Sequence, residues 1–532
     1  MKAKKILHKP SPTRTEELSE TRLLTGVAFP FLLPQPRYER LIQGLRDLII
    51  TLKVKPRYKV HFFSALIFSL TILNAVSYAQ EQEPGKHTGS ISLTQPKKSF
   101  QSFFGEVRVE TMQYLTPLVE SPNLTSSQYL SARLAGLYQS ENTPALNYAA
   151  DMSAVTFFIR SQSNYLIKEL YVSYKGSDTT KTVIGRKKHE WSALDSYWLT
   201  SIWQPNFAID LLRPEEQGLF GVFLDHKQDN VELLAFATPI FIPSIGPDIR
   251  EEGGSLVSDS RWYRRPSDKY NFNDRINSIT YKLDIPDIKE LVGKPGMGFS
   301  AKTGDKESGP WITVSGGYKP VNQLLLKRQN YKIIDQDQVD VKVKPDATYH
   351  GVFSTDVGYK FGDVKTTLSY LEDNPIEKKP EVDWAIQSPQ GLRAYSMILD
   401  FQLPNFFERN LQVQVAYLRV FGGEIIDITS EGPDTMTLFD DRMKFKNALS
   451  LKVMGPLFRV AQKPLIAKFS YLYDYLQRGT LIGTEFHYLP STHWAVLVGA
   501  DFLGVQDEDS SSRFLNQYRA NDRVYGGLSY VF

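Results

Sequence analysis

The chain has 532 residues, no cysteine, 12% aromatic residues and a formal net charge of +3. The absence of cysteine excludes a disulfide framework, a thiolate metal site and a cysteine nucleophile. The charge is uneven, because residues 1–79 hold 13 Lys and Arg against 5 Asp and Glu, which leaves the remaining chain mildly acidic. A mildly acidic body gives no reason to expect nucleic-acid binding.

An uncharged apolar run, Phe62–Leu73, lies within the basic front end. Its 12 residues are too few for a membrane-spanning helix, which needs about twenty apolar residues. Basic residues precede the run, and the small residues Ser77 and Ala79 follow it. This order is typical of a secretory signal peptide, so we predict a signal peptide over residues 54–79 with cleavage after Ala79. A permanent membrane anchor is the alternative.

The predicted signal peptide does not begin near residue 1, where such peptides normally begin. We therefore expect translation to start at Val54, which leaves residues 1–53 as an extension without function. Residues 80–99 are polar and are expected to form a flexible periplasmic lead-in. N-terminal sequencing of the unprocessed precursor should begin at position 54, and a precursor that begins at Met1 would contradict this start.

From residue 100 onward, short segments with alternating apolar and polar residues recur between turn residues. This alternation has the period of a β-strand with one apolar face. The segments predicted as strands are, in chain order, Gly105–Met112, Tyr129–Tyr138, Asn147–Arg160, Leu166–Lys175, Thr182–Lys188, Gly218–His226, Val231–Thr238, Ile276–Ile285, Met297–Thr303, Trp311–Tyr318, Val352–Phe361, Val364–Leu371, Leu392–Leu403, Leu411–Phe421, Met443–Val453, Leu465–Tyr475, Thr480–Tyr488, Trp494–Phe502 and a terminal strand.

The connections between these segments are unequal. Gly362-Asp363 is a strong two-residue hairpin signal. The long connections are His189–Gln217, Pro239–Asn271, Glu372–Gln390, Gly422–Arg442 and Gly504–Asn521. Alternating strands with short turns at one end and long loops at the other are typical of a transmembrane β-barrel, and single-chain bacterial barrels have an even number of strands. We predict an all-β fold, an antiparallel transmembrane barrel of about eighteen strands (sixteen to twenty) over residues 100–532. A series of soluble β-sandwiches is the alternative, although no linker separates such domains.

The last strand, Arg523–Phe532, alternates strictly and ends on an aromatic residue. A terminal aromatic strand of this kind resembles the assembly signal of bacterial outer-membrane barrels. We therefore expect the outer membrane of a Gram-negative bacterium as the location, with outer-membrane lipid, lipopolysaccharide and the barrel-assembly machinery as partners. The residues of the predicted signal are Val524, Gly526, Leu528, Tyr530 and Phe532.

The connection His189–Gln217 is too rich in aromatic residues for a free loop tip, so we expect it to fold inward and narrow a pore. A charge on the lipid face of a barrel costs about 2–4 kcal/mol at mid-bilayer. Arg186 and Lys188, which share a face, should therefore face the lumen, with Lys187 on the other face near the rim. A charge ladder without a solute role is the alternative. The residues predicted to line the constriction are Arg186, Lys188, Trp191, Trp198, Trp203 and Asp210.

The strand that ends in Glu169–Tyr174 is followed by Gly185-Arg186 with Trp191 and by Asp210 with Pro214. This stretch resembles alginate-export-type porins, which carry a Gly-Arg-x-x-x-x-Trp strand and a downstream Asp…Pro loop. Two positions depart from it, since Lys187 stands where the family usually has Gln and Ser192 where it usually has Gly. The resemblance implies a substrate-selective pore for anionic or organic solutes, and alginate itself is not carried over.

A second candidate site follows the apolar, proline-rich segment Pro239–Pro247. Arg261, Arg264 and Arg265 lie close together in sequence and could attract an anion. A packed loop with a solvated rim is the alternative.

The sequence offers no catalytic template and implies no cofactor or metal. Ser491 and His493 are close in sequence but lie in a predicted tight turn. We therefore predict a porin-like channel, not an enzyme, for passive and partly selective diffusion of small hydrophilic, including anionic, solutes. The alternatives are a non-conducting adhesin or structural barrel that acts through its long loops, and an outer-membrane enzyme. Oligomeric state does not follow from the sequence.

Overall fold

The computed structural model describes residues 102–118, 123–139, 145–158, 162–272, 275–333, 338–406, 409–430, 432–434, 442–506 and 513–532. The predicted extension, the signal peptide with its cleavage site at Ala79 and the lead-in all lie outside the described residues.

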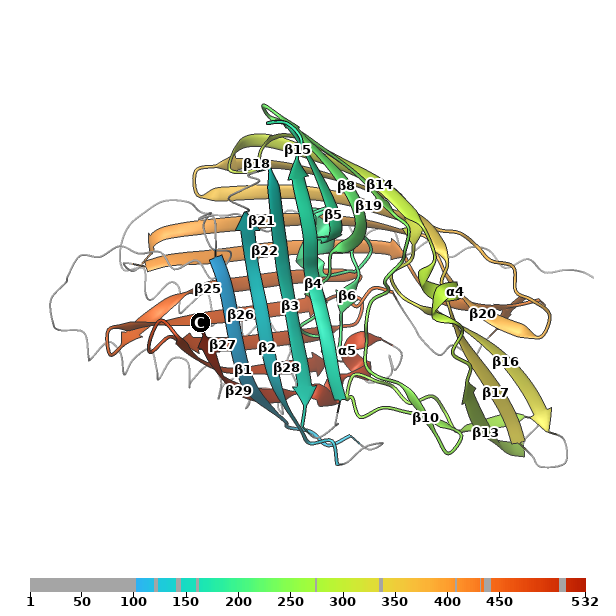
Figure 1. Cartoon of the computed structure of the whole chain (residues 1–532). Coiled ribbons are helices and arrows are strands. Elements are labelled where there is room, and N and C mark those ends of the chain that lie inside the picture. The colour runs from blue at the N-terminus through green and yellow to red at the C-terminus, as the bar shows by residue number, and fades with distance from the viewer. Residues whose placement is uncertain are drawn as a thin grey trace, which may run out of the picture. The chain divides into compact units, whose positions relative to one another are not determined.

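Eighteen strands form one closed antiparallel sheet, in which β29 pairs with β1 to complete a barrel (Figure 1). The prediction of about eighteen strands is confirmed. The barrel strands are β1 (Ser102–Tyr114), β2 (Ser126–Gln139), β3 (Leu146–Phe157), β4 (Gln162–Lys175), β5 (Thr180–Lys187), β8 (Leu219–Gln228), β9 (Val231–Thr238), β14 (Gly296–Asp305), β15 (Ser308–Pro320), β18 (Tyr349–Phe361), β19 (Val364–Pro375), β21 (Leu392–Phe406), β22 (Arg409–Gly422), β25 (Asn447–Val460), β26 (Lys463–Asp474), β27 (Gly479–Tyr488), β28 (Trp494–Val505) and β29 (Arg523–Val531).

The outer surface of the barrel is apolar. In β29, Val524 and Leu528 are exposed, whereas Arg523, Tyr525 and Ser529 on the other face are buried. The same alternation occurs around the barrel, because successive side chains of a strand point to opposite faces. An apolar exterior around a polar interior is the arrangement of outer-membrane barrels. Other exposed apolar side chains of the barrel strands include Val107, Leu134, Val172, Leu224, Leu233, Phe299, Val357, Leu368, Tyr417 and Val498.

Short and long connections lie at opposite ends of the barrel. Two-residue turns join β8 to β9, β14 to β15, β18 to β19 and β25 to β26. The turn at Gly362 has a positive φ of 56°, a conformation that glycine adopts without steric cost. These turns share an end with Phe532, because β29 runs toward that end. The six longest connections, which include the one between β5 and β8, lie at the opposite end.

Four of the long connections assemble into a second sheet of seven strands. Its strands are β12 (Lys269–Phe272), β13 (Arg275–Leu283), β17 (Gln338–Asp346), β16 (Leu325–Ile333), β20 (Trp384–Pro389), β23 (Ile425–Thr429) and β24 (Gly432–Asp434). Figure 1 shows β13, β16 and β17 beyond the barrel strands. The sheet has its own core of Leu256, Ile279, Tyr281, Val341 and Val343.

The prediction of Ile276–Ile285 as a barrel strand is wrong. This segment forms β13, which pairs in parallel with β17 and therefore belongs to the second sheet. A period of two shows that one face of a strand is buried, but it does not show against what. Here Ile279 and Tyr281 pack against Val341 and Val343 and do not face lipid.

The remaining elements are short. They are the paired strands β6 (Asn206–Phe207) and β7 (Glu215–Glu216), the paired strands β10 (Arg250–Glu252) and β11 (Ser255–Val257), and the helices α3 (Ala193–Trp198), α4 (Ile288–Val292), α5 (Phe514–Gln517) and η2 (Arg519–Asn521). Within the described part of the chain, no helix has the length and apolar character needed to cross a membrane.

Candidate functional site

Residues 188–218, here called the inner loop, connect β5 to β8 and lie inside the barrel. The indole nitrogen of Trp203 donates a hydrogen bond of 3.1 Å to the Ser354 hydroxyl on β18, and that of Trp198 donates one of 2.9 Å to Ser396 on β21. The Tyr197 hydroxyl lies 3.2 Å from that of Ser450 on β25. All three serines are buried on the inner faces of their strands, so the loop occupies part of the lumen.

Aromatic packing fixes the first half of the inner loop. Trp191 stacks on Trp203 with 5.0 Å between ring centroids and meets Phe236 of β9 edge-on at 5.4 Å. The Trp191 carbonyl accepts hydrogen bonds from Ser315 and Ser354. The shared core includes Val183, Leu194, Ile202, Leu219, Phe223, Leu234, Val352, Leu371, Leu392, Leu418 and Val420. One side of the barrel interior is therefore a hydrophobic core.

Asp195 holds the turn that follows α3. Its carboxylate accepts hydrogen bonds from the backbone N–H groups of Ile202 and Trp203 and from the Thr200 hydroxyl. Burial raises the pKa of Asp195 above its ordinary value, although these three donors favour the charged form. Burial and the nearby Asp195 also raise the pKa of Glu216 to about 7.

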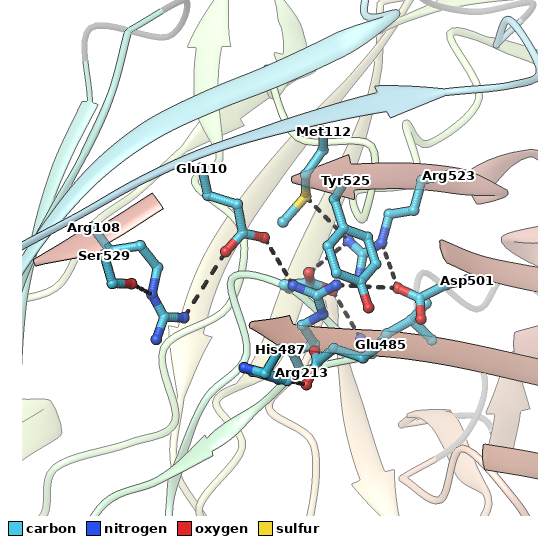
Figure 2. A network of polar contacts seen from close by, with 12 residues as sticks. Arg108, Glu110, Met112, Arg213, Glu485, His487, Asp501, Arg523, Tyr525 and Ser529 are labelled. Carbon is cyan, nitrogen blue, oxygen red and sulfur yellow. Dashed lines mark hydrogen bonds and ion pairs between the residues drawn. The ribbon is translucent and has the colours of Figure 1, made fainter. Parts of the chain in front are cut away.

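Ion pairs hold the second half of the inner loop at the seam between β29 and β1 (Figure 2). Arg213 donates to Glu110 of β1 at 2.9 Å, and its guanidinium lies 3.6 Å from the ring centroid of Tyr525. Arg523 of β29 donates to Asp210 at 2.6 Å and to Asp501 of β28 at 2.8 Å. The inner loop thus crosses the lumen from β18 and β21 to the opposite wall.

The inner wall is packed unevenly as a result. Along β8, β9 and β18, buried and exposed residues alternate, because the inward side chains are covered by the loop. Along β3 and β27, almost every residue is partly exposed, so their inward side chains are not fully covered. Space for water therefore remains beside these strands.

Two small residues, Ser470 and Gly483, line the wall beside this space, between the two anchored halves of the inner loop. The register places Lys452 of β25, Ser470 of β26, Gly483 of β27 and Asp501 of β28 side by side in one inward row. Adjacent strands lie about 4.8 Å apart, so β25 and β28 are separated by about 14 Å. Tyr197 lies at the Lys452 end of this row, and the Asp501 end holds Arg523. We call the wall at Ser470 and Gly483 the lumen window.

Most charged side chains of the inner wall are paired, either within one strand or across neighbouring strands. The pairs include Arg108 with Glu106 (2.7 Å), Arg133 with Asp151 (2.9 Å), Lys187 with Asp225 (2.5 Å), Lys468 with Glu485 (2.8 Å) and Arg523 with Asp501 (2.8 Å). Positive and negative charges therefore alternate along the wall and largely offset each other.

The predicted constriction residues occupy different positions. Trp191 and Trp203 are buried anchors, Trp198 is a partly buried anchor, and Asp210 is held by Arg523. The Lys188 backbone N–H donates to Glu169 at 2.9 Å, and its ammonium lies 4.0 Å from Asp151. A direct contact of these residues with solutes stays a prediction.

Lys187 does not lie on the expected face, whereas the Arg186 side chain contacts the inner loop inside the barrel. In the barrel register, Arg186 pairs with the outward-facing Leu170 and Phe220, and Lys187 pairs with the buried Leu219. Lys187 therefore faces inward, which corrects its expected position. Gly185, with a φ of 128°, distorts the strand beside Arg186, whose side chain turns to the inner loop although its register partners face outward. The Arg186 side chain is buried and donates to the Gly218 carbonyl at 3.0 Å and to Gln217.

The three arginines of the second predicted site are not equivalent. Arg261 is 2% exposed and donates to the carbonyls of Thr116, Leu124 and Ala520 and to the Asn521 side chain. It therefore packs three long-loop connections together at the mouth of the barrel. Arg264 and Arg265 are exposed, and Arg265 donates to Ser255 at 3.0 Å. An anion site at these two residues stays a prediction.

The residues that anchor Asp210 and Arg213, here called the tip of the inner loop, were not predicted from the sequence. Glu110, Arg213, Asp501 and Arg523 were not singled out, although Glu106, Arg108 and Glu110 alternate with Val107 and Val109 in sequence. That alternation was sufficient to place three charges on the inner wall. Their partners come from strands and loops up to 421 residues away, and nothing local in the sequence indicates them.

Ser491 and His493 form a turn. The Ser491 hydroxyl accepts hydrogen bonds from the backbone N–H groups of His493 and Trp494, at 3.3 and 3.1 Å. The Nδ1 atom of the His493 ring lies 2.9 Å from the Val531 carbonyl oxygen, so this ring nitrogen is directed to the backbone of β29. The pair therefore fits the predicted structural role.

Comparison with known proteins gives a structural likeness only. No protein-family model and no curated protein sequence matches the chain, so the resemblance to alginate-export-type porins stays a prediction. Among solved structures, the chain is similar to the outer-membrane protein OmpT of Vibrio cholerae in its in-vitro folded form, with 9% identity, a TM-score of 0.35 and coverage of 81% of this chain and 97% of that chain. A loop L8 deletion mutant of OmpT gives 9% identity, a TM-score of 0.35 and coverage of 81% and 98%. OmpT expressed in the outer membrane gives 8% identity, a TM-score of 0.33 and coverage of 81% of this chain and 97% of that chain. Because these TM-scores are below 0.5, they add nothing to what the chain's own strand order establishes.

Proposed function

We propose that this barrel conducts small hydrophilic solutes passively across the outer membrane. The observation that carries the proposal is the uneven packing of the lumen, in which the inner loop covers β8, β9 and β18 and leaves β3 and β27 partly exposed. Solutes pass along the lumen between the inner loop and the part of the wall called the lumen window, at Ser470 and Gly483. Pore diameter and the groups that line it set selectivity in such channels.

The polar lining of the lumen favours passive diffusion of solutes and not tight binding of one solute. The inward charges of the passage are mostly tied in pairs, such as Arg133 with Asp151 and Lys468 with Glu485. Paired charges keep the wall hydrated without binding one solute tightly, which suits a channel that solutes must also leave.

Single-channel recording tests this function. The protein purified from outer membranes is expected to give stable conductance steps in a planar lipid bilayer. Heat-denatured protein at the same concentration serves as the control for membrane damage. A barrel that inserts, as judged by protease protection, and never conducts would refute the channel.

A second function is favoured by the loop-built sheet. The long connections of a passive channel need not form a folded sheet, whereas here seven strands with a separate core do so at the long-loop end of the barrel. An adhesin or structural protein would present such a sheet to a partner. Binding of the protein to host-cell or bacterial surfaces, together with absent conductance, would favour this function over the channel.

A further inference from the structure

We propose that Lys452, held against the ring of Tyr197, selects for small anionic solutes in the passage; this inference rests on the proposed channel function. Lys452 lies on β25 and is partly exposed. Its ammonium group is 3.9 Å from the centroid of the Tyr197 ring. Tyr197 belongs to the inner loop, so wall and loop meet at this lysine.

Most cations of the inner wall have an acidic partner, and Lys452 has none among the residues that the structure describes. Within the described residues, no carboxylate lies within ion-pair distance of its ammonium group. Its neighbours in the row are the neutral Gln414 and Ser470. Beyond Gln414 the row continues with Asp400, which accepts hydrogen bonds from Gln412 and Gln414 at 3.2–3.3 Å. The charge of Lys452 is therefore not offset locally.

The surroundings hold this charge in place. The Tyr197 hydroxyl is fixed by Ser450, two residues before Lys452 on the same face of β25. A cation over the face of an aromatic ring is attracted by the ring, which restricts the lysine to one side of the window. The Tyr197 ring carries no full charge, so the ammonium group can still attract an anion from the lumen.

The lumen window lies directly beside this group. Ser470 and Gly483 have the smallest side chains of the row, and both are partly exposed. A Cβ atom at Gly483 would lie 2.5 Å from the Ser470 hydroxyl oxygen and 3.3 Å from Asp501, so any larger residue would enter this space. An anion that passes the window is therefore brought close to Lys452. Small carboxylates and inorganic anions fit this description.

Reversal potentials in a KCl gradient across a planar bilayer test the proposal, with potassium and chloride as the probes. The wild-type channel should prefer chloride, and Lys452→Gln should reduce the chloride-to-potassium permeability ratio about fivefold, as expected when one charge about 8 Å from the ion path in water acts on the two ions with opposite signs. Lys452→Arg should retain the preference. Lys269→Gln serves as the matched control, because it removes the same charge from an exposed position on β12 of the second sheet.

The outcomes separate the two proposals. A Lys452→Gln channel with wild-type conductance and an unchanged permeability ratio would overturn the role of Lys452 and leave the channel function intact. Equal shifts in Lys452→Gln and Lys269→Gln would also overturn it, because the net charge of the protein would then set selectivity. A wild-type protein that never conducts would overturn both proposals.

Discussion

Arg213→Ala is expected to raise the single-channel conductance about twofold and to add flicker to the open state, since pore diameter limits conduction. Arg213 joins the tip of the inner loop to Glu110, lies 3.6 Å from Asp501 and stacks on Tyr525. Removal of one partner from a buried ion pair costs about 3–5 kcal/mol. The tip should therefore leave the seam and widen the passage. Conductance in symmetric KCl measures this effect.

Arg250→Ala provides the control for the loss of an arginine. Arg250 also forms several ion pairs, with Asp248, Glu252 and Asp259, but these lie in an exposed loop outside the lumen. Its conductance should equal that of the wild type, because exposed ion pairs contribute about 0–1 kcal/mol. If Arg213→Ala also conducts like the wild type, the docked tip does not limit the passage.

The anchoring of the loop tip depends on closure of the barrel. Arg523 is the first residue of the last strand, and Glu110 lies on the first strand. The two strands pair only when the sheet closes, with Arg523 opposite Tyr114. The site that holds Asp210 and Arg213 therefore forms only in the closed barrel. Docking of the loop tip therefore requires closure of the barrel.

The barrel could be predicted from the sequence because its strands carry a local signal. Alternation such as Leu528, Tyr530 and Phe532 against Ser529 and Val531 needs no knowledge of the partner strand. The second sheet could not be predicted in this way. Its strands β13 and β17 come from separate connections and pair in parallel, and alternation in β13 does not show whether its apolar face meets lipid or protein.

The candidate site was predictable only in part, for the same reason. The aromatic content of the inner loop indicated an inward position, but it did not show that Trp191 and Trp203 pack and do not line the passage. Lys452 has an ordinary strand context, and its contact with Tyr197 joins positions more than 250 residues apart. A contact between such distant residues depends on the closed barrel, so no local pattern indicates it.

Trp203→Ala is expected to cause the largest loss of stability, about 3–5 kcal/mol, which is typical of a buried aromatic residue replaced by alanine. The indole stacks on Trp191 and donates to Ser354, and it fits against β15 because Gly317 has no side chain: a Cβ there would lie 2.9 Å from the ring. Alanine would remove all three contacts and leave a cavity between the loop and the wall. Urea unfolding of the protein in lipid vesicles, followed by tryptophan fluorescence and by heat-modifiable migration in gels, measures the loss.

Trp384→Ala is the matched control, because Trp384 lies on β20 of the second sheet and is partly exposed. It should cost less free energy of unfolding and leave the conductance unchanged. Trp203→Ala should instead change both, since the inner loop that loses its anchor also borders the lumen window. Equal losses of stability in the two variants would show that the aromatic core inside the barrel does not fix the loop. The loop would then depend on its ion pairs at the seam, and Arg213→Ala alone would release it.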